Sequence, residues 1–101
     1  MVIKGVIAAM MLKEEKPYTQ AVNNNIIIRT FEKNVSTDEL KWHRDSHDRT
    51  IEVLKGTNWF YQLDDSIPIK MQEGMIFKIN KDVWHRVIGG DSDLVVRIIE
   101  G

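Results

Sequence analysis

The sequence contains no cysteine and only two prolines among its 101 residues. The lack of cysteine excludes disulfides and thiolate metal sites, so a bound metal ion would need His, Asp or Glu ligands. It is also compatible with a cytoplasmic protein, which is the location we expect. The chain has no basic excess either, because its formal net charge is -1. We therefore expect no nucleic-acid partner.

The N-terminal stretch from Met1 to Leu12 is apolar apart from Lys4. It is too short to cross a bilayer, and it fits the pattern of a signal peptide poorly. We therefore expect no membrane partner. An exposed apolar stretch of this kind needs cover, which favours a strand or a contact between two copies. We expect residues 1–22 to form an N-terminal strand and dimerisation segment in a homodimer.

The rest of the chain alternates between short apolar runs and turn residues. This rhythm is typical of an all-β sandwich or barrel, and the runs are rich in Ile, Val, Trp and Phe, as strands are. The expected strands cover residues 26–31, 50–54, 59–63, 67–71, 75–79, 83–88 and 94–99. A short helix is expected only before Pro17, and residues 36–39 are interpreted as a turn. The length and the 43% hydrophobic content predict one domain over residues 1–101.

Strand alternation places ionisable side chains on apolar faces. Arg49 shares its face with two apolar residues of the same strand, and His85 lies between two valines on one face. The same rule puts His43 and Asp45 on one face ahead of a turn. Burying such groups costs several kcal/mol unless they are paired or bind a ligand. The pattern therefore indicates a pocket.

The segment from His43 to Gly56 resembles the first motif of the cupin family, HxHxxxxExxxxxxG. His43 falls on the first histidine and Gly56 on the closing glycine. Residues 74–89 resemble the second motif, GxxxxxPxGxxHxxxN, with Gly74 and His85 in register. The positions where this motif usually has proline, glycine and asparagine hold Asn80, Asp82 and Gly89. The two motifs lie within residues 40–101, and the resemblance implies an all-β, single-domain cupin jelly-roll barrel.

Two positions of the first motif depart from the family pattern. Asp45 stands where the second histidine is usual, and Arg49 stands where the glutamate ligand is usual. The metal ligands that the resemblance implies are therefore His43, Asp45 and His85, with His47 in the following turn as a further candidate. Two histidines and one carboxylate leave coordination positions open and suit Fe(II) or a similar divalent ion. Fe, Mn, Ni and Zn are the candidate metals.

Arg49 beside Asp45 leaves two interpretations open. In the first, the chain is a divalent-metal-dependent enzyme acting on a small molecule, such as an oxygenase or a sugar isomerase or epimerase. In the second, Asp45 and Arg49 form a salt bridge and no metal binds. The pocket would then be a metal-free site for a small anionic ligand, held by Arg49 and the histidines, in an enzyme or in a non-enzymatic binding module.

A second resemblance concerns the order of the candidate ligands. The His-x-Asp…His order is similar to that of 2-oxoglutarate-dependent oxygenases. In that family an arginine beyond the second histidine holds the carboxylate of the co-substrate, and Arg97 stands near that place. Arg97 is therefore a second candidate ligand-binding residue, beside Arg49.

The tripeptide Trp-His-Arg occurs twice, at residues 42–44 and 84–86. We expect the two histidines to face one site, which puts both tryptophans on the opposite face. Trp42 and Trp84 are expected to pack in the core or in an interface, and Trp59 in the core. Arg44 and Arg86 are interpreted as surface or dimer-contact residues.

Overall fold

The computed structural model describes residues 16–35 and 40–101. These residues form strands and turns and contain no helix, as the sequence predicts. The strands are β2 (Thr19–Asn23), β3 (Ile26–Phe31), β4 (Arg49–Lys55), β5 (Phe60–Leu63), β6 (Ile69–Lys70), β7 (Ile76–Ile79), β8 (His85–Ile88) and β9 (Leu94–Glu100). The seven strands expected from residue 26 onward are all present, with bounds that differ by at most two residues. The expected helix and the expected turn at 36–39 lie outside the described residues.

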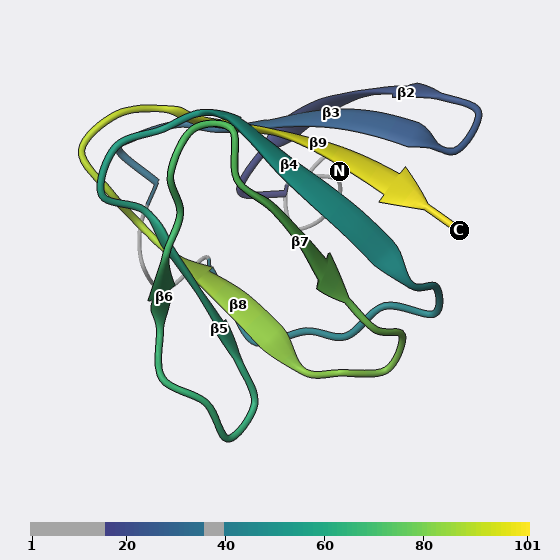
Figure 1. The fold of residues 1–101 in the computed structure, drawn as a ribbon. Coiled ribbons are helices and arrows are strands. Elements are labelled where there is room, and N and C mark those ends of the chain that lie inside the picture. Colours follow the sequence, from purple (N-terminus) through teal and green to yellow (C-terminus); the bar gives the residue numbers. More distant parts are fainter. Residues whose placement is uncertain (1–15, 36–39) are drawn as a thin grey trace, which may run out of the picture.

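The strands form two antiparallel sheets that face each other (Figure 1). The larger sheet has the order β2-β3-β9-β4-β7, and the smaller sheet has the order β6-β5-β8. Among the described strands, the hydrogen bonds do not close the two sheets into one continuous barrel. The arrangement is that of a jelly roll, in which several neighbouring strands, such as β3 and β9 or β4 and β9, are distant in the sequence. No helix in the described part of the chain is long and apolar enough to cross a membrane.

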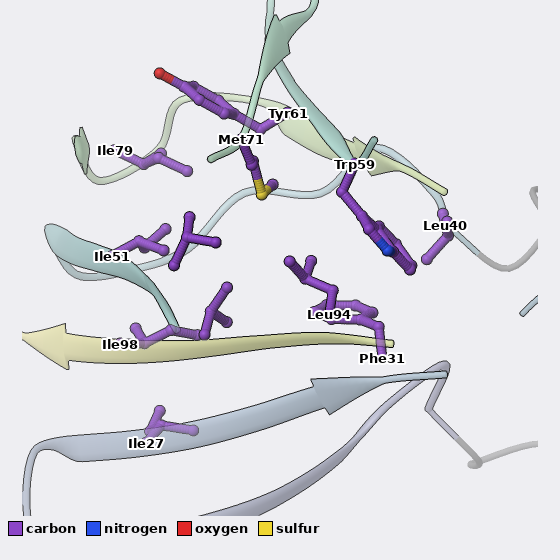
Figure 2. Close-up of a cluster of buried hydrophobic side chains, with 12 residues drawn as sticks. Ile27, Phe31, Leu40, Ile51, Trp59, Tyr61, Met71, Ile79, Leu94 and Ile98 are labelled. Carbon is purple, nitrogen blue, oxygen red and sulfur yellow. The ribbon is translucent and has the colours of Figure 1, made fainter. Parts of the chain in front are cut away.

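Alternation along the strands fills the space between the sheets. In β9, Leu94, Val96 and Ile98 are buried, and the residues between them are more exposed. Ile98 lies between Ile27 of β3 and Ile51 of β4 in the register of the larger sheet. Figure 2 shows these side chains pointing toward Trp59, Tyr61 and Met71 of the opposite layer. The face predicted for residues 49–53 is likewise confirmed, because Ile51 and Val53 are both buried.

Turn residues set where the strands reverse. β2 and β3 are joined by Asn24 and Asn25, and Asn24 has a φ of 57°, which asparagine tolerates better than most residues. Gly74 begins the second motif with a φ of 89°, where a side chain would strain the backbone. Gly90 packs against the backbone of Thr57 and Asn58 so closely that a Cβ atom would clash. These turns fix the register that positions the pocket.

Candidate metal site and pocket

A backbone bridge brings His43 and His85 together. The two residues exchange both backbone hydrogen bonds, with N···O distances of 2.9 and 2.8 Å. Directly opposite residues in an antiparallel pair project to the same face. The two imidazole rings accordingly touch edge to face, with centroids 4.2 Å apart. His85 is buried and His43 is exposed at the rim.

Each ring is oriented by a main-chain carbonyl of its own strand. Nδ1 of His85 lies 2.8 Å from the carbonyl oxygen of Val83, and Nδ1 of His43 lies 3.1 Å from that of Lys41. A carbonyl can only accept, so both Nδ1 atoms carry the proton in the neutral rings. Each Nε2 then keeps its lone pair. Outer hydrogen bonds of this kind are typical of histidines that bind metals.

Asp45 completes the cluster, and its two carboxylate oxygens have different surroundings. Oδ1 lies 3.2 Å from Nη1 of Arg49. Oδ2 lies 3.3 Å from Nε2 of His85, but it is buried and forms no hydrogen bond with the residues described. One ligand atom from each of His43, Asp45 and His85 lies within 4.8 Å of the other two. The structure therefore brings the three predicted ligands together.

The charges around the cluster keep Asp45 ionised and His43 neutral. Burial by itself would raise the pKa of Asp45, but a hydrogen bond from Nε2 of His85, when that ring is protonated, and the Arg49 guanidinium outweigh it and lower that pKa. For His43, burial of the ring lowers the pKa, and its bond to the Lys41 carbonyl only partly opposes this. An ionised carboxylate and a neutral imidazole are the protonation states in which both groups bind metal ions.

The donor set fits a divalent metal ion. A buried carboxylate oxygen that has no hydrogen-bond partner among the described residues lies 3.3 Å from Nε2 of His85, and in the neutral rings Nε2 of both histidines can only accept. Three acceptors gathered around one point need a cation or a proton between them. Two histidines and one carboxylate are a known set for such ions and leave positions open for a small molecule.

The space beside the cluster is a cavity of about 340 Å³. Its walls include apolar side chains of both sheets, and the stacked rings of Tyr61 and Phe77 lie 3.9 Å apart on one side. His43, Asp45 and His85 reach it from one end. A cavity of this size holds a small organic molecule.

The comparisons with known proteins concern the fold. No protein-family model and no curated protein matches the chain. Among solved structures, an RmlC-like cupin family protein of Methanocaldococcus jannaschii with a double-stranded β-helix fold is similar, with a TM-score of 0.68 and 17% identity over 88% of this chain and 84% of that one. KdgF of Halomonas sp. has a TM-score of 0.63 and 15% identity over 85% of this chain and 82% of that chain. Hydroxypropylphosphonic acid epoxidase of S. wedmorenis has a TM-score of 0.65 and 12% identity over 83% of this chain but 49% of that enzyme.

The chain has the cupin fold. The resemblance of its two motifs to cupin motifs is thereby confirmed at the level of the fold. His43 and His85 lie side by side in the structure although 42 positions separate them in the sequence, because a cupin jelly roll brings its two motifs together.

Arg49 occupies the position of the usual cupin glutamate, and its charge is shared between two carboxylates. Its Nε and Nη2 lie 2.9 and 2.6 Å from Oε2 of Glu100, and its Nη1 lies 3.2 Å from Asp45. Glu100 was not among the residues singled out from the sequence. Its role follows from the register, in which Arg49 pairs with Glu100 across β4 and β9. Arg49 is therefore already paired and does not cancel the charge of Asp45.

Two other candidates from the sequence lie outside the cluster. His47 is exposed in the turn, where its Nδ1 contacts the Ser46 hydroxyl, and it is not among the grouped ligands. Arg97 is exposed and pairs with Glu52, and it does not line the cavity. The reason is alternation along β9, because Val96 and Ile98 on either side of Arg97 point inward.

The two tryptophans of the repeated tripeptide do not pack in the core. Trp42 and Trp84 are 40% and 43% exposed, so for them the expectation of core burial is corrected, whereas Trp59 is fully buried. The bridge at His43 places each tryptophan opposite the arginine of the other tripeptide. Arg86 lies over the Trp42 ring at 4.9 Å, and Arg44 lies over the Trp84 ring at 5.2 Å. Both rings are covered by cations instead of apolar side chains.

Proposed function

We propose that this cupin binds one divalent metal ion through His43, Asp45 and His85 and acts as an enzyme on a small molecule in the adjoining cavity. The observation that carries the proposal is the buried Oδ2 of Asp45. It has no hydrogen-bond partner among the described residues and faces the two imidazoles. A buried unpaired carboxylate oxygen is costly and is expected where a ligand satisfies it.

Each residue of the chain has a separate part in this site. Nε2 of His43, Nε2 of His85 and Oδ2 of Asp45 would hold the ion. The carbonyls of Lys41 and Val83 fix the rings, and Arg49 holds the other oxygen of Asp45 in place. When bound, the ion would supply Lewis-acid polarisation of a substrate oxygen or activation of dioxygen. The apolar walls of the cavity would exclude water from the substrate.

The alternative of a metal-free anion site on Arg49 has less support. Three nitrogens of Arg49 are engaged by Glu100 and Asp45. An incoming anion would have to displace one of these carboxylates and leave it unpaired, which is unfavourable in a half-buried site. Arg49 thus serves the proposal as a residue that orients Asp45.

Metal analysis of protein purified without chelator tests the proposal. We expect close to one equivalent of Fe, Mn, Ni or Zn, and we expect His43→Ala, Asp45→Ala and His85→Ala each to lose it. His47→Ala is the matched control and should retain the metal, because His47 lies outside the cluster. If the protein takes up none of these four ions on incubation, or if His47→Ala loses the ion as the others do, the proposed site is wrong.

A second measurement tests for open coordination positions. Co²⁺-substituted protein should show a visible spectrum that changes when azide is added, because three protein ligands leave room for an exogenous one. If azide does not change the spectrum, the site is closed and structural, which would contradict an enzymatic role for the ion.

A further inference from the structure

Arg29 is a buried cation that takes no part in the candidate metal site. It lies in β3 between Ile27 and Phe31 and is only 7% exposed, yet it lines the cavity. Alternation requires it to point inward, since both neighbouring inward positions belong to the core. A charged side chain in such a position is rare unless it is paired.

The pairing of Arg29 is incomplete. Its Nε donates to Oε1 of Gln20 at 2.9 Å, and its guanidinium lies 3.8 Å from the ring centroid of Tyr18. Within residues 16–35 and 40–101, no carboxylate lies within salt-bridge distance of it, and its two terminal nitrogens have no hydrogen-bond partner. Burial lowers the pKa of Arg29, although an arginine stays protonated at neutral pH. Arg49, by contrast, forms salt bridges with two carboxylates.

We propose that Arg29 holds the carboxylate of the cavity's ligand, so that the substrate class is a small organic acid with an apolar body. The planar pair of terminal nitrogens matches the two oxygens of a carboxylate. The body of the acid would lie against the apolar wall that contains the stacked Tyr61 and Phe77 rings.

The charges at the site favour the same ligand, in a step that rests on the proposed metal. Among the described residues that line the cavity, Lys16, Arg29, Lys41, Arg49 and Arg86 carry positive charge and Asp45 carries the negative one, so the metal-free pocket is already positive. A divalent ion would bring two positive charges, which a carboxylate would partly offset. Metal-loaded protein should therefore bind the acid more tightly than metal-free protein does.

Calorimetric titration with carboxylates and their neutral amides tests the proposal. The probes are benzoate, phenylacetate and hexanoate, each compared with its own amide, on EDTA-treated protein and on protein reloaded with metal. At least one acid should bind about tenfold or more tightly than its amide, and Arg29→Met should abolish that preference. Arg97→Met is the matched control, because Arg97 is an exposed arginine outside the cavity, and it should keep the preference.

Two further measurements separate this role from a structural one. Arg29→Met should melt at the same temperature as the wild type or higher, because it removes a buried cation that has no carboxylate partner within residues 16–35 and 40–101. Arg29→Lys keeps the charge but not the planar pair of donors, so it should fold and bind the acid less tightly than the wild type. If Arg29→Met melts markedly lower, or if no acid is preferred over its amide, Arg29 is a structural residue and the proposal is wrong.

The titration of EDTA-treated protein distinguishes the proposal for Arg29 from the proposal of a metal site. A preference for acids that depends on Arg29 in EDTA-treated protein supports the role of Arg29, whatever becomes of the metal site. Stoichiometric metal without any preference for acids supports the metal site and overturns the role of Arg29.

Discussion

The two ends of the space between the sheets differ in how completely their groups are paired. At the apolar end Phe31, Trp59 and Leu94 are buried, and the indole N–H of Trp59 donates to the carbonyl of Ser92 at 2.6 Å (Figure 2). At the polar end, Asp45 keeps a buried oxygen without a hydrogen-bond partner. β9 connects the two ends, running from Leu94 to Glu100. The first end has the complete packing that stability requires, and the second has the unsatisfied acceptors that binding requires.

The largest expected loss of stability comes from truncating a buried side chain at the apolar end. Trp59→Ala should lower the free energy of unfolding by about 3–5 kcal/mol, the range for large aromatic truncations in cores. Urea titration measures the loss. Trp84→Ala is the control and should cost far less, because the Trp84 ring is 43% exposed. Equal losses in the two variants would contradict the assignment of stability to this end.

At the polar end, a substitution should weaken metal binding strongly and change the free energy of unfolding little. Asp45→Asn keeps the shape of the side chain but removes the charge, so metal affinity should fall by more than the roughly 10–100-fold typical of outer-shell changes. The free energy of unfolding of the metal-free protein should fall only slightly, because Asp45 loses its salt bridge to Arg49 while Arg49 keeps Glu100 as its partner. Metal-dependent melting shifts and urea titration measure the two quantities. Asp64→Asn, at an exposed turn position, is the control.

Glu100 is the carboxylate that pairs with Arg49 at the polar end. Glu100→Gln should leave Arg49 with Asp45 as its only carboxylate partner among the described residues, so the guanidinium should draw that carboxylate away from the histidines. We expect metal affinity to fall about tenfold, at the lower limit for outer-shell partners. Arg49→Met should lower the affinity as well, because it removes the guanidinium that holds Oδ1 of Asp45 in place. Competition with a chelator of known affinity measures both variants, and a rise in affinity in Arg49→Met would contradict the positioning role of Arg49.

The pH dependence of stability should come from the polar end. The pKa of His43 is lowered in the folded protein, so the unfolded chain takes up its proton first as the pH falls through 6.5. Stability of the metal-free protein should therefore fall on acidification between 6.5 and the folded pKa. The lowered pKa of Asp45 acts in the same direction below about 3.8, where its stabilising effect is lost as the pH falls through the folded value.

Urea titrations at pH 7.5 and pH 5.5, in the presence of EDTA, measure the effect of His43. His43→Gln should show a smaller loss of stability between these pH values than the wild type. His47→Gln should behave as the wild type does, because His47 lies outside the cluster. An unchanged pH dependence in His43→Gln would show that other groups titrate.

The sequence predicted much of the fold because the turns and the alternating strands are local signals. Runs such as residues 75–79 stand between Gly74 and the turn at Asn80, and the structure has β7 there. β2 was harder to predict in detail, because its five residues are all exposed and carry no alternating apolar pattern. Its residues 19–22 fell within the segment 1–22 expected to contain a strand.

The candidate site was predictable only in part. The repeated Trp-His-Arg tripeptides indicated that the two histidines face one site, and the bridge at His43 shows them doing so. Glu100 and Arg29 were missed, because their contacts depend on registers between strands that are far apart in the sequence. β3 begins with three isoleucines, so neither face was marked as inward before the structure placed Arg29 there.

The smallest expected effect concerns the outer side of the bridge that holds His43. Arg44 and Trp84 face each other there at 5.2 Å, and such a pair at an exposed site contributes about 0.5–1 kcal/mol. A double-mutant cycle with Arg44→Met and Trp84→Leu should give a coupling energy in this range by urea titration. Because the pair supports the strand segment that carries His43, each single variant should also weaken metal binding slightly. A coupling energy of zero would mean that this pair does not help to hold His43 against His85, which would leave the backbone bridge and the Arg86–Trp42 pair to do so.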